Sequence, residues 1–240
     1  MKLSILIPVY NEEKTVADVI EKVMAIKMPN VEQEIVLVDD GSKDKTSENI
    51  RAFVEQSKAK NIKFFQHKIN QGKGAALRTA IEKATGDYAI IQDADLEYNP
   101  SYIPKLIEPI QKRLAEVVFG TRLNRMPNIT RDENHPLFLL HYLGNRGLSF
   151  ITSVLYGQWL TDMNTCYKIF PLSFFKKNPL VSNGFDVDPE ITIRLIKSGY
   201  KILELPIRTT PRGYGEGKKL NTIRDGIKSL KTIIRYRFGN

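Results

Sequence analysis

The stretch LSILIPVYNEEKTVADVIEKVMAI, Leu3 to Ile26, joins an apolar strand pattern directly to a helical one. Residues 3–9 form a nearly continuous apolar run, and residues 15–26 carry apolar side chains at helical spacing. The same order recurs, with apolar runs at 34–40, 61–67 and 87–93 separated by helical patterns at 44–56 and 74–84. Strands joined through single helices build a mainly parallel sheet with right-handed crossovers. The predicted fold class is therefore α/β, a Rossmann-like sheet flanked by helices.

The second half of the chain has a less regular pattern. It predicts helices at 101–114 and 188–198, short strands at 116–122 and 200–207, and a polar loop at 127–134. No internal repeat and no linker composition interrupt the 240 residues. We expect one domain over the whole chain, 1–240.

Composition narrows the class of partner. Lys and Arg number 36 against 27 Asp and Glu, a net charge of +9 that favours phosphates, nucleic acid or an anionic membrane. Nucleic acid fits poorly because the basic residues are not interleaved with aromatic ones. Cys166 is the single cysteine, which favours a reducing compartment. Since His141, Asn145 and Arg146 interrupt the most hydrophobic segment, Pro136–Tyr156, we expect a soluble or peripheral protein.

Three carboxylates follow the apolar run that ends near residue 92. Alternation on an extended segment would place Asp93, Asp95 and Glu97 on one side. Crowded carboxylates raise one another's pKa unless a cation neutralises them, and Mg²⁺ or Mn²⁺ suits such ligands. An EF-hand fails because Tyr98 stands where glycine is needed and Pro104 where the bidentate glutamate is needed. The alternative to a metal site is a solvated acidic turn.

Two further polar clusters follow predicted strands. VDDGS, 38–42, is either a turn with a helix cap or a carboxylate that binds a nucleobase or ribose. NQGKGAA, 70–76, is not a P-loop, because no glycine precedes Gly72 at the required spacing and Gly74 replaces the Ser or Thr. We expect instead a loop whose backbone approaches a ligand closely. Ligands of such sheets bind beyond the carboxyl ends of the strands, where these clusters fall.

Several motifs occur together in a specific order. SILIPVYNEE (4–13), VDDGSKDKT (38–46), NQGKGAA (70–76), DADLE (93–97) and GTR (120–122) resemble, in order and spacing, family-2 glycosyltransferases with the GT-A fold. LTDMNTCYKIF (160–170) and GFDVDPEITIRL (184–195) continue the match, and RGYGEGKKL (212–220) resembles the basic loop of dolichol-phosphate mannose synthases and related polyprenyl-phosphate hexosyltransferases. The resemblance covers nearly the whole chain. Cys166 departs from it, since many relatives have glycine there.

The resemblance implies a role for each half of the chain: 1–122 binds the nucleotide sugar and 123–240 binds the acceptor. The residues implied to hold the nucleotide are Pro8, Tyr10, Glu12, Asp40, Gly72 and Asp93. Those implied to hold a Mg²⁺ or Mn²⁺ ion are Asp93, Asp95 and Glu97. Those implied to act in catalysis are Asp95, Arg122, Asp162, Arg212 and Lys218.

The implied reaction is an inverting displacement at the anomeric carbon. A cation and Arg122 would stabilise the charge that develops on the diphosphate leaving group. A polyprenyl phosphate is already largely ionised at neutral pH, so a strong general base is unnecessary. Asp162 would position the sugar or stabilise positive charge, or would be an ordinary cap or turn residue. Arg212 and Lys218 would close over phosphates from a glycine-rich lid, or would belong to an ordinary solvated basic loop.

The C-terminal helical pattern, residues 221–238, carries two neighbouring stripes. The apolar stripe is Ile223, Ile227, Leu230 and Ile234, and the basic stripe is Arg224, Lys228, Lys231 and Arg235. Such a helix either lies on an anionic membrane surface or packs on the domain with its charges outward. Trp159 is expected in the core.

These inferences converge on a metal-dependent, inverting hexosyltransferase. It would move mannose from GDP-mannose, or glucose from UDP-glucose as the next choice, to a polyprenyl or dolichyl phosphate. We expect it in the cytoplasm, at the cytoplasmic face of a membrane. The alternatives are transfer to a hydroxyl of a glycan or cell-surface polysaccharide, and a non-catalytic, membrane-associated protein that binds nucleotide sugars.

Overall fold

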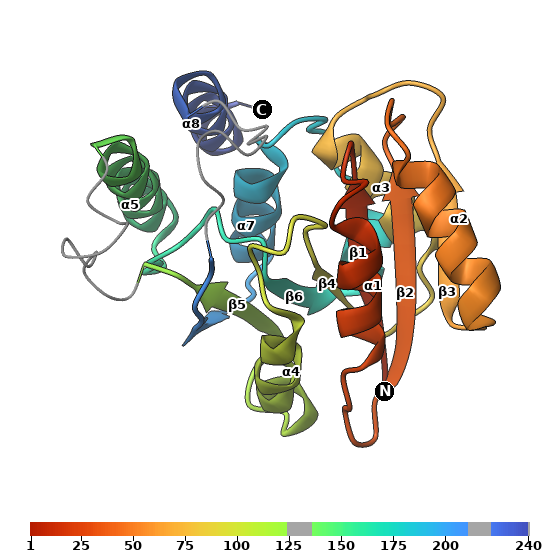
Figure 1. Cartoon of the computed structure of the whole chain (residues 1–240). Helices are drawn as coiled ribbons and strands as arrows, with labels where there is room; N and C mark the ends of the chain where they lie inside the picture. The colour runs from red at the N-terminus through yellow and green to blue at the C-terminus, as the bar shows by residue number, and fades with distance from the viewer. Residues whose placement is uncertain (124–135, 211–221, 240) are drawn as a thin grey trace.

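A seven-stranded sheet forms the centre of the described part of the chain, in the order β3-β2-β1-β4-β6-β5-β7. The structure, a computed structural model, describes residues 1–123, 136–210 and 222–239 (Figure 1). Except for β6, which runs antiparallel to β4 and β5, the strands are parallel. The strands are β1 (Lys2–Val9), β2 (Glu32–Asp39), β3 (Ile62–Gln66), β4 (Tyr88–Ile91), β5 (Val117–Thr121), β6 (Lys168–Pro171) and β7 (Ile202–Pro206). The predicted α/β class with a mainly parallel sheet is confirmed.

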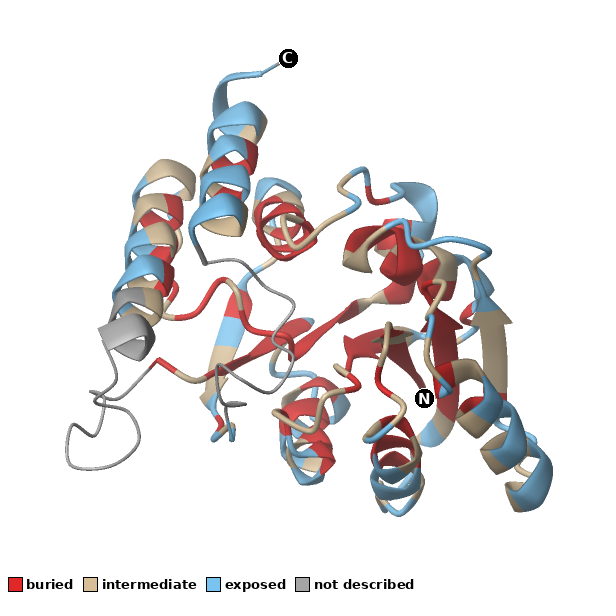
Figure 2. Cartoon of the chain, turned by 45° about the horizontal axis from the view of Figure 1, so that its top comes forward, coloured by how far each residue is buried: buried red, intermediate tan, exposed pale blue. Residues whose placement is uncertain are grey.

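Helices cover both faces of this sheet (Figure 2). They are α1 (Val16–Met24), α2 (Thr46–Ser57), α3 (Lys73–Lys83), α4 (Ile103–Gln111), α6 (Leu172–Lys177) and α7 (Val187–Lys197), with a short 3₁₀ turn at Pro100–Tyr102. Two further helices, α5 (Pro136–Tyr156) and α8 (Thr222–Phe238), pack against α7 and against each other. They form an outer layer beyond α7 (Figure 1). None of the helices in the described ranges is long and apolar enough to cross a membrane.

The core explains why the central strands read as continuous apolar runs. Leu3, Ile5, Leu6 and Ile7 of β1 are all fully buried, on both faces of the strand. A parallel sheet with helices on each side leaves neither face to water, so the alternation of polar and apolar residues disappears. A second, smaller core of Met163, Ile193 and Ile233 joins the loop before β6 to α7 and α8.

Two expectations about local structure are wrong. β4 ends at Ile91, and the acidic segment after it is a turn in which Leu96 has a positive φ of 62°, so Asp93, Asp95 and Glu97 do not alternate along an extended strand. Trp159 is 65% exposed and packs edge-to-face on Phe150, so it is not a core residue. The sequence analysis also did not foresee β6 and α6, which are only four and six residues long. The predicted polar loop at 127–134 lies outside the described residues.

Candidate active site

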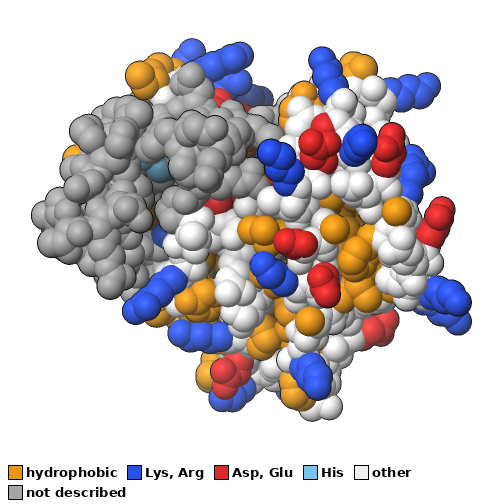
Figure 3. Space-filling model, in the orientation of Figure 1, with side chains coloured by type: hydrophobic (Ala, Val, Ile, Leu, Met, Phe, Trp, Pro, Cys, Tyr) orange, Lys and Arg blue, Asp and Glu red, His pale blue; other side chains and the backbone are white. Residues whose placement is uncertain are grey.

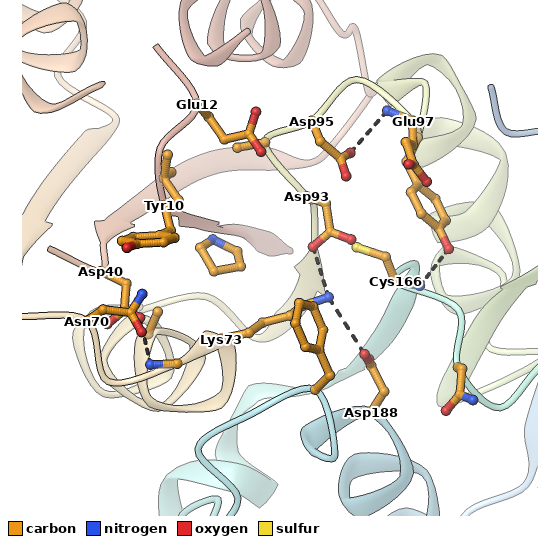
Figure 4. Close-up of a pocket in the computed structure, with 18 of the residues that line it drawn as sticks. Tyr10, Glu12, Asp40, Asn70, Lys73, Asp93, Asp95, Glu97, Cys166 and Asp188 are labelled. Carbon is orange, nitrogen blue, oxygen red and sulfur yellow. Dashed lines mark hydrogen bonds and ion pairs between the residues drawn. The ribbon is translucent and has the colours of Figure 1, made fainter. Parts of the chain in front are cut away.

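A cavity of about 370 Å³ opens where β1, β2 and β4 end (Figure 4). The carboxyl ends of parallel strands meet at one edge of the sheet, so motifs far apart in the sequence converge there. Nine of the residues predicted for the site line this cavity: Pro8, Tyr10, Glu12, Asp40, Gly72, Asp93, Asp95, Glu97 and Arg122. Arg212 and Lys218, which were predicted to form a lid, lie outside the described residues.

Asp40, at the end of β2, organises the loop that follows β3. Its carboxylate is buried and accepts hydrogen bonds from the backbone N–H of Gln71, at 3.0 and 3.1 Å, and of Gly72, at 2.7 Å. His67 Nδ1 lies 2.7 Å from the same group. These contacts fix the backbone of Gln71 and Gly72 beside the cavity, where Asp40 is labelled in Figure 4. A contact between Asp40 and a nucleobase or ribose stays a prediction.

The glycines of this loop meet the protein's own backbone. A Cβ on Gly72, where φ is +101°, would lie 2.3 Å from the carbonyl oxygen of Asn183, and one on Gly74 would lie 2.2 Å from that of Ser182. Gly74 N–H donates to the Asn183 carbonyl at 2.7 Å. Gly72 and Gly74 therefore allow this loop to pack closely on the segment before α7, and a close approach of the loop to a ligand stays a prediction.

Four charged side chains form a chain of ion pairs along the cavity wall. Lys73 Nζ lies 2.9 Å from Asp93 Oδ1 and 3.6 Å from Asp188 Oδ2, as the dashed lines in Figure 4 mark. Asp188 also accepts a hydrogen bond of 2.8 Å from the fully buried Lys168. Burial alone lowers the pKa of Lys73, but Asp188 and Asp93 together raise it well above its usual value. Lys73 is therefore a permanent cation inside the site.

The acidic turn is shaped to present carboxylates to the cavity. Asp95 Oδ1 accepts a hydrogen bond from the Glu97 N–H at 3.1 Å, which stabilises the turn around the left-handed residue between them. No three His, Cys, Asp or Glu side chains come together as a metal cluster in the ranges that the structure describes. Mg²⁺ binds proteins through one or two carboxylates and takes its other ligands from phosphates and water, so Asp95 and Glu97 fit such an ion. Asp93 is paired with Lys73, and its role as a third metal ligand stays a prediction.

Arg122, which is partly exposed to the cavity, and the fully buried Asp162 form a two-point ion pair. Arg122 Nε donates to Asp162 Oδ2 at 2.7 Å, its Nη2 donates to Oδ1 at 2.8 Å, and its backbone N–H donates to Oδ2 at 3.0 Å. Burial lowers the pKa of Arg122, but Asp162 raises it well above the usual range. The Tyr98 ring lies beneath the guanidinium, with its centroid 5.6 Å from Cζ. Asp162 is itself fully buried and is not among the residues that line the cavity, so a contact with a sugar would require this pair to open.

Sequence reasoning missed several residues that line the cavity. They are Val9, Asn70, Lys73, Ala76, Ala94, Tyr98, His141, Asn164, Cys166, Phe185 and Asp188. Lys73 and Asp188 lie inside stretches that had been singled out, NQGKGAA and GFDVDPEITIRL, so a signal existed. Tyr98 gave no such signal, because its place depends on a hydrogen bond to its hydroxyl from the Cys166 N–H, 68 residues away, at 3.0 Å.

The family model described as Glycosyl transferase family 2 matches residues 4–178, and the chain belongs to this family. A UDP-N-acetylglucosamine–dolichyl-phosphate N-acetylglucosaminyltransferase of Methanococcus voltae is 31% identical, over 98% of this chain and 96% of the relative. Glycosyltransferase AglJ of Haloferax volcanii is 29% identical, over 92% of this chain and 67% of the relative. The chain is thus a glycosyltransferase.

Solved structures agree on the fold. Glucosyl-3-phosphoglycerate synthase of Mycobacterium tuberculosis, in complex with Mn²⁺, UDP and glucosyl-3-phosphoglycerate, superposes with a TM-score of 0.69. The match covers 98% of this chain and 80% of that one, at 18% sequence identity. The chain therefore has the GT-A fold that its motifs predicted.

Proposed function

We propose that this glycosyltransferase moves a sugar from a nucleotide sugar to a polyprenyl phosphate in the presence of Mg²⁺ or Mn²⁺. The observation that carries the proposal is the cavity at the strand ends. The carboxylates of Asp95 and Glu97 and the cation Arg122 all line this cavity. Its dimensions and its mixed charges suit a nucleotide diphosphate and one sugar. The relative from Methanococcus voltae, named for transfer to dolichyl phosphate, supports the acceptor class.

The donor sugar is the finer part of the proposal. The motifs favour mannose from GDP-mannose, with glucose from UDP-glucose next. The name of the Methanococcus voltae relative adds UDP-N-acetylglucosamine as a third donor. The identities of the described lining residues do not by themselves select one donor, so the three donors belong in one panel.

The described residues have separable roles in this reaction. Asp95 and Glu97 would hold the divalent ion, which, when bound, neutralises negative charge on the diphosphate. Arg122 would face the same leaving group, and Asp162 keeps its guanidinium in place through the two-point pair. An oxygen of the acceptor phosphate forms the new bond to the anomeric carbon as the bond from that carbon to the diphosphate breaks. No side chain needs to remove a proton, because the acceptor phosphate is already ionised at neutral pH.

A donor panel tests the proposal. The protein is incubated with each radiolabelled nucleotide sugar, a short polyprenyl phosphate and Mg²⁺ or Mn²⁺, and the product is extracted into organic solvent. We expect label in the organic phase with one donor. Label that moves instead to a soluble sugar acceptor, with none in the lipid extract, would contradict the proposal and support a hydroxyl acceptor.

A polyprenyl phosphate acceptor also implies that the enzyme acts at a membrane surface, which we propose to be the anionic, cytoplasmic face.

A further inference from the structure

The outer helices α5 and α8 bury several small polar side chains against the domain, next to a few apolar ones. On α8, Ser229 and Thr232 are buried against the domain, beside Ile233 of the second core. On α5 the buried positions include Ser149 and Thr152. A helix that packs on a domain in water normally shows the reverse arrangement, with its apolar stripe facing the core.

Local hydrogen bonds make this inward polarity tolerable. On α5, Ser149 Oγ donates to the carbonyl of Asn145 at 2.9 Å and accepts from the Met163 N–H at 2.9 Å. Thr152 Oγ1 donates to the Leu148 carbonyl at 2.9 Å. Each hydroxyl is satisfied within the protein, so no water is needed on the inner side.

The outward faces of the same helices carry large apolar side chains. Those on α8 are 46–72% exposed: Ile223, Ile227, Ile234 and Phe238. They include three of the four residues predicted to form an apolar stripe, and spacings of four and seven residues keep them on one side of the helix. On and beside α5, the matching residues are 56–66% exposed: Leu143, Phe150, Val154 and Trp159. The two helices lie side by side in both views (Figures 1 and 2).

Positive charge borders the apolar stripe of α8. The exposed basic side chains of this helix are Arg224, Lys228, Lys231, Arg235 and Arg237, against one acid, Asp225. Figure 3 shows hydrophobic and basic side chains together at the top of the molecule, over α8. An apolar stripe bordered by Lys and Arg is the pattern of a helix that lies in the interface of an anionic bilayer.

We propose that α5 and α8 together form a membrane-docking surface that inserts their exposed apolar side chains into an anionic lipid surface. A second copy of the chain is a poorer occupant, because a symmetric contact would bring two sets of five basic side chains of α8 together. α5 also links this surface to the cavity: His141 lines the cavity, and the exposed stripe begins two residues later, at Leu143. This inference deepens the proposed function, since it places the site beside a lipid-borne acceptor.

Vesicle co-sedimentation tests the surface directly. The wild-type chain is mixed with phosphatidylcholine vesicles, with or without phosphatidylglycerol, at low and high salt. We expect binding to the anionic vesicles that weakens with salt. Ile227→Glu combined with Ile234→Glu is expected to weaken it roughly tenfold or more, because two charges enter the apolar face. Leu114→Glu, at a position 75% exposed after α4, is the matched control and is expected to bind like the wild type.

Three outcomes would overturn the docking surface. They are wild-type binding by the double variant, equal loss of binding in the Leu114→Glu control, and a wild-type dimer in lipid-free sedimentation velocity that the double variant does not form.

Transfer assays separate this proposal from the proposed function. The double variant is expected to keep the wild-type rate with a water-soluble, short-chain acceptor and to lose activity toward acceptor in vesicles. Wild-type vesicle binding without transfer to any acceptor would refute the proposed function alone.

Discussion

The central strands bury their apolar side chains, whereas the outer helices leave several of theirs exposed. In β1 the side chains of Leu3, Ile5 and Ile7 are completely buried between two helical layers. In α8 the side chains of Ile227 and Phe238 point outward, while serine and threonine face the protein. Water surrounding the molecule explains the first arrangement. Exposed apolar side chains gathered on one helix face are instead typical of a surface that binds a partner or a membrane.

The largest effect is expected at the acidic turn, which lines the cavity at the ends of the central strands. Asp95→Asn removes a charged oxygen ligand from the proposed ion site and is expected to lower the rate of transfer roughly a thousandfold. The domain is expected to stay folded, since Asp95 lines a cavity rather than the core. Initial rates and far-UV circular dichroism check both parts, with Asp18→Asn on the exposed face of α1 as the control. Near-normal transfer by Asp95→Asn would remove the metal argument.

Two isoleucine-to-alanine variants, one in β1 and one in α8, compare how much a buried and an exposed apolar side chain contribute to stability. Ile5→Ala leaves a cavity between β1 and the helices and is expected to lower the free energy of unfolding by roughly 3 kcal/mol. Ile227→Ala, in a side chain that is half exposed, is expected to cost less than about 1 kcal/mol in lipid-free buffer. Urea denaturation of both variants gives the two numbers. Equal costs would mean that α8 buries its outer face within the protein.

The two-point ion pair between Arg122 and Asp162 is expected to contribute to the stability of the fold. Asp162→Asn leaves the mostly buried guanidinium without its counter-charge and is expected to cost roughly 3 kcal/mol of unfolding free energy. Arg122→Met added to Asp162→Leu is expected to recover part of that loss, because no unpaired charge remains. A double-mutant cycle by urea denaturation measures the coupling. A single-variant loss below about 1 kcal/mol would show that solvent, not Asp162, satisfies Arg122.

A smaller effect on folding stability is expected when pH changes the charge of Glu34, which lies far from both the cavity and the outer helices. Burial raises the pKa of Glu34, but Lys63, Ser4 and Thr85 lower it to about 2, against 4.5 for a free glutamate. A folded pKa below the unfolded one stabilises the protein above pH 4.5, and this stability is lost as pH falls from there toward about 2.

Urea midpoints at neutral and acidic pH check this contribution. Glu34→Gln is expected to remove roughly 2 kcal/mol of stability at neutral pH and to change stability little near the folded pKa. Transfer activity at neutral pH is expected to be unchanged at temperatures where the variant is folded, because Glu34 does not line the cavity. A variant whose acid sensitivity equals that of the wild type would show that other groups set it.

Much of the fold could be predicted from the sequence because its signals are local. Apolar runs and helical spacing identify β1, α1 and β2 within a few residues, and parallel order then brings their polar ends to one edge. β6 escaped because four residues carry too little pattern, and its antiparallel direction depends on strands far away in the chain. The turn at residues 93–97 escaped because alternating acids look alike in a strand and in a turn.

The candidate site was predicted in its residue types better than in its contacts. The motifs correctly predicted nine residues that line the cavity. They did not indicate that Lys73 forms an ion pair with Asp93 or that Asp162 forms one with Arg122. Those pairs depend on tertiary distances that no spacing in the sequence encodes. Trp159 was misassigned for a related reason: hydrophobicity alone says that a side chain avoids water, not whether protein or lipid replaces the water.

In the proposed reaction a divalent ion and a phosphate acceptor meet in one cavity, and one transfer assay tests both. Labelled nucleotide sugar and polyprenyl phosphate are incubated with the wild-type chain, with Mg²⁺ or Mn²⁺ or with excess EDTA, and lipid-extractable label is counted. The account predicts label in the lipid extract with the ion and a loss of roughly a hundredfold or more with EDTA. Equal product with and without the chelator, or product only on a soluble hydroxyl acceptor, would contradict it.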